Sequence, residues 1–103
     1  MTFELHVAVT QDDIVEGRIG ESRSCPIACA LRRQGVLDPQ VGLYAVLSLD
    51  WGATLPYEAS AFVDRFDHEQ PVEPIEFNLQ CTPFEDSGSM VMISGELYER
   101  EDY

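Results

Sequence analysis

The chain has 103 residues and a formal charge of -13, from 19 acidic residues against six arginines and no lysine. This length supports one hydrophobic core, so we expect residues 1–103 to form a single domain, and a two-domain enzyme is excluded. Binding to DNA, RNA or an anionic membrane depends on neutralising phosphate with Lys and Arg, so direct contact with any of them is disfavoured.

The first third of the chain predicts a strand and two helical segments. Apolar and polar residues alternate over 3–10, which indicates a strand with one buried face. Thr10 can cap a helical turn that reaches Gly17, with Asp13 at the position of a capping-box acid. Ser24 precedes Cys25 and Pro26 and predicts a helix over 25–34 that ends at Gly35.

The middle of the chain predicts a long strand followed by a helix. Residues 41–50 alternate, with an apolar face made of Val41, Leu43, Ala45, Leu47 and Leu49. Residues 50–52 resemble a turn into a short strand over 53–55. From Pro56 to Asp67 the apolar spacing predicts a helix, and the polar segment 68–74 predicts a loop.

Two further strands are expected near the end of the chain, at 75–82 and 90–98, followed by an acidic tail over 99–103 that frays. Four or five one-sided strands and two amphipathic helices predict an α+β fold, in which a mostly antiparallel sheet carries both helices on one face as a two-layer sandwich. The uncovered face is then a candidate partner surface or simply a solvated face. It would carry Glu4, His6, Tyr44, Glu76, Asn78, Gln80, Met90 and Met92.

The sequence also predicts where the protein resides. Residues 1–10 lack the features of a signal peptide, and no apolar run approaches about 18 residues, so we expect a cytoplasmic protein without a membrane segment. Three cysteines in a reducing compartment are expected to remain thiols.

No motif for catalysis or for a cofactor is present. Cys25 and Cys29 lie on one helix face and could join Cys81, His6 or His68 at a zinc ion, but the second close pair of ligands typical of zinc sites is missing. Cys29 lies among apolar residues, which favours a core role. Cys25 lies at a helix start near Arg23, which favours a lowered pKa. We therefore expect no enzyme activity and no cofactor.

The charge is concentrated in the later two thirds of the chain. Residues 1–33 carry four arginines and five acids, whereas 34–103 carry 14 acids and two arginines. A negative patch from the final third would favour a basic protein, since rows of carboxylates can approximate the phosphates of DNA. The predicted partner-binding residues are Glu73, Glu76, Glu85, Asp86, Glu96, Glu99, Glu101 and Asp102.

Residues 9–35 and 55–79 resemble a family of small uncharacterised proteins encoded by bacteriophages and prophages. The shared features are a TQ-x-x-I start, a Cys-Pro-hydrophobic-Ala helix and an FD-x-x-x-PVxPxxF segment. The resemblance implies a phage origin and carries no activity with it.

Three functions follow as hypotheses. The first is a non-enzymatic acidic inhibitor of a host nucleic-acid-binding or defence protein, comparable to anti-CRISPR proteins and DNA mimics; the analogy with phage strategies supports it. The second is an assembly protein that forms a homo-oligomer, such as a homodimer, through a sheet edge or the uncovered face. The third is a small zinc- or thiol-dependent protein that uses Cys25 and Cys29.

Overall fold

The computed structural model describes residues 2–84, and they form an α+β fold with one open antiparallel sheet. The strand order is β1-β5-β4-β3-β2, and three helices pack against the sheet, so the predicted fold class is confirmed. The elements are β1 (Phe3–Val9), α1 (Gln11–Glu16), α2 (Pro26–Arg33), β2 (Gln40–Val41), β3 (Ala45–Leu47), β4 (Trp51–Thr54), α3 (Tyr57–Asp67) and β5 (Ile75–Pro83). The predicted strand at 90–98 and tail at 99–103 lie outside the described residues.

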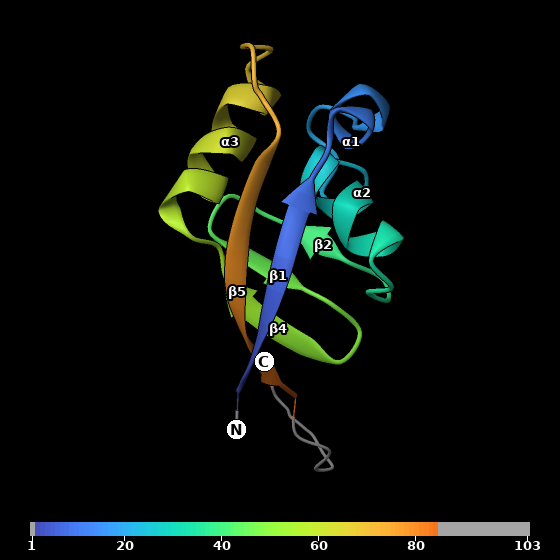
Figure 1. Ribbon diagram of the computed structural model, residues 1–103, viewed down its shortest axis with the longest axis vertical. Coiled ribbons are helices and arrows are strands. Elements are labelled where there is room, and N and C mark those ends of the chain that lie inside the picture. Colours follow the sequence, from blue (N-terminus) through green and yellow to red (C-terminus); the bar gives the residue numbers. More distant parts are fainter. Residues whose placement is uncertain (1, 85–103) are drawn as a thin grey trace, which may run out of the picture.

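The longest strands, β1 and β5, form the central pair of Figure 1, between α3 on one side and α1 and α2 on the other. Their register runs from Phe3 opposite Cys81 to Val9 opposite Ile75. Buried and exposed residues alternate along β5, because one face of the sheet meets the helices and the other meets solvent. The alternation predicted for both strands is confirmed.

The single strand predicted over 41–50 is wrong, because this segment is a hairpin. Val41 of β2 pairs with Val46 of β3, and the amide of Gly42 donates to the carbonyl of Ala45 at 2.8 Å. Because the chain reverses direction between β2 and β3, the buried face passes from odd-numbered to even-numbered residues. Val46 is therefore fully buried. The residues that were expected on the apolar face beyond Val41 are exposed: Leu43, Ala45, Leu47 and Leu49.

The turn predicted at 50–52 lies earlier in the chain. The amide of Ser48 donates to the carbonyl of Trp51 at 2.8 Å, and the Ser48 hydroxyl oxygen accepts from the amide of Trp51 at 3.1 Å. Trp51 thus begins β4 instead of lying in the turn. Its ring is buried and meets the ring of Phe3 edge to face, with the ring centres 6.0 Å apart.

The helix boundaries follow the predicted caps closely. Thr10 and Asp13 form the expected capping box at the start of α1. The cap of α2 is Cys25 instead of Ser24, because Pro26 is already the first helical residue. Gly35 follows α2 with φ +97°, the left-handed conformation expected of a glycine there.

Helix α2 lies in the middle of the core and contacts both edge strands, β1 and β2. Ile27, Ala28, Ala30 and Leu31 are all fully buried. Two alanines on a buried face let the helix approach the sheet closely. The twisted sheet therefore wraps around α2, and α3 covers β5 beside it.

The exposed edge of β1 is capped by side chains from the end of α2. The Gln34 side chain accepts from the amide of Ala8 at 3.1 Å and donates to the carbonyl of His6 at 2.8 Å. Arg33 donates to the carbonyl of Ala8 at 2.7 Å. A second copy of the chain would need these same backbone groups to add a strand at this edge.

Replacing Gln34 by alanine is expected to lower the free energy of unfolding by about 1–2 kcal/mol, since two hydrogen bonds are lost. It should also make the protein associate at high concentration, because the freed edge can pair with another chain. Light scattering against concentration checks this, with Gln70→Ala as the control, whose side chain makes no hydrogen bond within residues 2–84. A strictly monomeric Gln34→Ala protein of unchanged stability would contradict the capping role.

Candidate interaction surface

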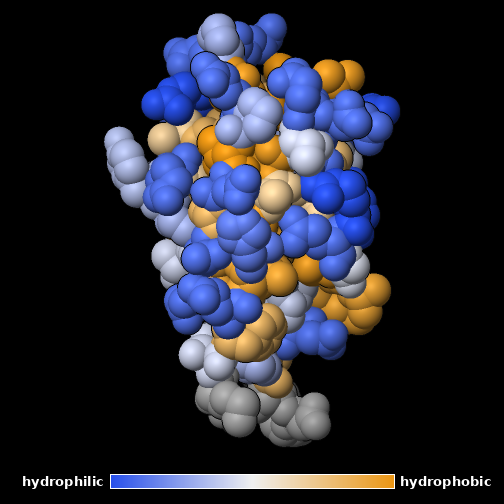
Figure 2. All heavy atoms as spheres, in the orientation of Figure 1, coloured by the Kyte–Doolittle hydropathy of each residue, from blue (hydrophilic) through white to orange (hydrophobic). Residues whose placement is uncertain are grey.

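The uncovered sheet face carries a row of polar side chains along β1 and β5. Glu4 lies opposite Gln80, and His6 lies opposite Asn78. With Glu76, all five are exposed as predicted, and hydrophilic side chains run down the middle of this view in Figure 2. Tyr44 is also exposed but belongs to the hairpin turn instead of a strand, and Met90 and Met92 lie outside the described residues.

His6 links the polar row across the two strands. Its Nδ1 lies 2.8 Å from Oδ1 of Asn78, and its Nε2 lies 2.9 Å from Oε1 of Glu76. These acceptors suit a ring with both nitrogens protonated, so hydrogen bonding to Asn78 and then to Glu76 raises the pKa of His6. A protonated His6 neutralises part of the charge of this face.

Only two of the eight predicted partner-binding residues, Glu73 and Glu76, lie within residues 2–84. Glu76 lies on the uncovered face and contacts His6, whereas Glu73 lines a groove beside α3 together with Glu58 and Arg65. The other six lie outside the described residues: Glu85, Asp86, Glu96, Glu99, Glu101 and Asp102.

The structure adds Glu58, Asp64, Asp67 and Glu69 to the predicted Glu73 and Glu76. The segment 57–76, which forms α3, its following loop and the start of β5, holds six acids and one arginine, a formal charge of -5. We call these acids the acidic side; they are Glu58, Asp64, Asp67, Glu69, Glu73 and Glu76. A signal was present in the sequence, because acids at the end of a helix oppose its dipole and are unusual there.

Four of the six arginines lie on the side of the molecule that α2 forms, whereas Arg65 lies on α3. The segment 18–33, which leads into α2 and includes it, carries four arginines and one acid, a formal charge of +3. Arg33 contacts Asp13 at 2.9 Å, and Arg23 lies 3.9 Å from Asp38. Within residues 2–84, no arginine forms an ion pair with the acidic side.

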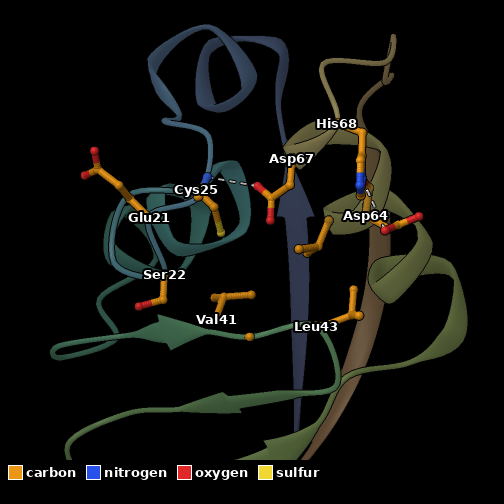
Figure 3. A pocket seen from close by; sticks show the side chains of 11 residues that line it. Glu21, Ser22, Cys25, Val41, Leu43, Asp64, Asp67 and His68 are labelled. Atoms are coloured by element: carbon orange, nitrogen blue, oxygen red, sulfur yellow. Dashed lines mark hydrogen bonds and ion pairs between the residues drawn. The ribbon is translucent and has the colours of Figure 1, made fainter.

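A cavity of about 280 Å³ lies where these two sides meet. One wall comes from the loop before α2, the other from the last turns of α3, and the β2–β3 hairpin forms the floor (Figure 3). Val41, Leu43 and Val63 make its lining largely apolar. The carboxylate of Asp67 faces the cavity, and its Oδ1 accepts from the amide of Gly20 at 3.1 Å.

His68 lies at the rim of the same cavity. Its Nδ1 lies 2.8 Å from the carbonyl oxygen of Asp64 and 3.4 Å from the Asp64 carboxylate. These two contacts with Asp64 raise the pKa of His68. The rim therefore becomes less negative when His68 is protonated.

The three cysteines are free thiols. Cys25 is buried, and burial raises its pKa, so the lowered pKa expected from its place at the helix start is wrong. Cys29 donates to the carbonyl of Ser24 at 3.6 Å, and Cys81 is buried in the sheet. Across residues 2–84, no group of three or more His, Cys, Asp or Glu side chains is placed to hold a metal ion.

Comparison of the chain with protein-family models, curated proteins and solved structures finds no match. The resemblance to small phage-encoded proteins thus stays a prediction. In the part of the chain that the structure describes, no helix is both long and apolar enough to cross a membrane.

Proposed function

We propose that this is a non-enzymatic binding protein whose acidic side associates with a basic protein. The observation that carries the proposal is the separation of charge. The segment 57–76 bears a formal charge of -5, and among residues 2–84 the carboxylates of the acidic side form no ion pair with an arginine. Asp64 and Glu76 each contact a histidine, whereas the other four carboxylates of the acidic side have no ion pair within residues 2–84 and remain available to a positive charge on a partner.

The position of these acids supports a role in binding over a role in stability. Asp64 and Asp67 lie in the last turn of α3, and Glu69 comes immediately after the C-cap residue His68. The carbonyl end of a helix is partially negative, so carboxylates there are unfavourable by about 0.3–1 kcal/mol each. Glu69 also has φ +60°, a left-handed conformation that costs a residue with a side chain about 1–2 kcal/mol.

The partner that fits best is a nucleic-acid-binding protein, because its basic groove is built to receive spaced negative charges. The proposal includes inhibition: a protein seated in that groove excludes DNA or RNA from it. A host defence protein of a phage-infected cell is one such partner, and the resemblance described above is the reason to include it.

The test is affinity purification from a bacterial lysate at low and high salt, followed by competition with duplex DNA. Basic proteins should be captured at low salt, lost at high salt and displaced by DNA, because the association is electrostatic and shares the groove. The variant Glu58→Gln, Glu69→Gln and Glu73→Gln should lose this capture.

A matched control removes three charges elsewhere: Asp12→Asn and Glu16→Gln on α1, and Asp50→Asn in the β3–β4 turn. It should retain the partner. Equal loss in both variants would mean that only net charge matters, and capture of no basic protein would end the proposal. The variant Glu96→Gln, Glu99→Gln and Glu101→Gln tests the predicted contribution of the C-terminal acids in the same way.

A further inference from the structure

The cavity between α2 and α3 combines features that suit a long side chain ending in a positive charge. Val41, Leu43 and Val63 form the apolar part of its lining, polar residues such as Glu21 and His68 complete it, and the exposed Asp67 faces into it. No arginine lines it. An alkyl stem is stabilised by apolar walls, and a charged end is stabilised by a carboxylate.

Cys25 lines the cavity with a buried thiol. This residue is only 4% exposed, and its side chain extends into the cavity without making a capping hydrogen bond to α2 (Figure 3). Burial raises the pKa of the thiol, and the nearby Asp67 charge contributes in the same direction. The Cys25 thiol is therefore uncharged. The negative charge of the cavity comes from Asp67 and from the acidic residues at the rim.

We infer that this cavity receives a lysine side chain of the basic partner. This inference rests on the proposed function and names the contact at its centre. The lysine stem packs against the apolar side chains that line the cavity, and its ammonium group meets the free oxygen of Asp67.

The geometry favours lysine over arginine. Oδ1 of Asp67 already accepts from the amide of Gly20 at 3.1 Å, so one oxygen is left for a ligand. Arginine binds carboxylates best through two parallel hydrogen bonds, which need both oxygens. The lysine ammonium group is a compact charge with three rotatable N–H donors, so a single carboxylate oxygen is enough for its hydrogen bond.

The experiment is a titration of the full chain, followed by the NMR signals of the Gly20, Val41 and Gly42 amides. The probes are N-acetyl-lysine methylamide, the equivalent arginine compound and the neutral norleucine compound. The lysine probe should shift these signals with a saturable dependence on concentration, and at least about tenfold more tightly than norleucine, as one charge-assisted hydrogen bond implies. Equal binding of norleucine, tighter binding of arginine or shifts elsewhere would each overturn the inference.

Two variants test the cavity separately from the acidic side. Asp67→Asn removes the charge and should weaken lysine binding about tenfold. Cys25→Leu fills the cavity without changing charge and should weaken it too, with a melting curve to show that each variant is folded. Asp50→Asn, outside both the cavity and the acidic side, should leave lysine binding unchanged.

The outcomes separate this inference from the proposed function. If Asp67→Asn and Cys25→Leu bind the lysine probe as the unchanged protein does, the cavity assignment is wrong. Capture of basic proteins through Glu58, Glu69 and Glu73 would then still support the proposed function. If the cavity binds lysine but no basic protein is captured, the proposed function fails instead.

Discussion

Asp13→Ala is expected to lower the free energy of unfolding by about 2–3 kcal/mol, because the capping box and the hydrogen bonds from Arg33 to a buried carboxylate are lost. The side chain of Asp13 is 6% exposed. Its Oδ2 accepts from the amide of Thr10 at 2.8 Å and from Arg33 at 2.9 Å. One carboxylate therefore joins the end of β1, the start of α1 and the end of α2.

Asp12→Ala is the matched control, because it removes the neighbouring acid of the same helical turn, which is exposed. It should lose only the weak interaction with the helix dipole, about 0.3–1 kcal/mol. Chemical denaturation of both variants measures the difference. If the two lose the same stability, the contacts of Asp13 do not stabilise the fold beyond an ordinary surface charge.

The pH dependence has a definite sign. Burial acts to raise the pKa of Asp13, but the hydrogen bonds from Arg33 and Thr10 outweigh it and hold the pKa below its usual value. The stabilisation is thus present above the unfolded-state pKa of about 3.9 and is lost as the pH falls through the lower folded-state pKa. The stability difference between the unchanged protein and Asp13→Ala should shrink over that range and remain constant from pH 6 to 8, a range well above the normal Asp pKa of about 3.9.

The contacts of Asp13 show which parts of this fold could be predicted from the sequence. Its role in the capping box follows from its distance of three residues from Thr10, because such contacts are local. Its pairing with Arg33, 20 residues further along, depends on how α1 and α2 pack and has no local signal. Likewise, the alternation over 41–50 continues through the turn at 42–44, so the pattern alone could not reveal the hairpin.

The same limit applies to the candidate surface. Glu4, His6 and Glu76 on the uncovered face were predictable, since alternation in β1 and β5 assigns each residue to a face. The cavity was not, because Asp67 and Cys25 are brought together by loop 18–24, whose path no periodic pattern specifies. Spacing along α3 placed Asp64 and Asp67 one turn apart but could not say what they face.

Gly17→Ala is expected to cost about 2–3 kcal/mol, as insertion of a methyl group into a packed contact does. A Cβ on Gly17 would lie 2.6 Å from Cδ and Cγ of Pro26 and 2.7 Å from its backbone nitrogen. The proline ring is rigid and cannot rotate away. The end of α1 must then move from the start of α2, and each kcal/mol lost should lower the melting temperature by about 4–8 °C.

Gly42→Ala is the matched control for this prediction, because a Cβ there meets only the carbonyl oxygen of Ala45, at an ordinary 3.6 Å. Its melting temperature should stay close to that of the unchanged protein. The effect of Gly17→Ala should also reach the cavity, since Pro26 follows Cys25 and loop 18–24 carries Gly20 to Asp67. Weaker binding of the lysine probe to Gly17→Ala than to the unchanged protein would connect the packing of α1 on α2 to the geometry of the proposed site. An unchanged melting temperature for Gly17→Ala would show that the two helices separate without cost.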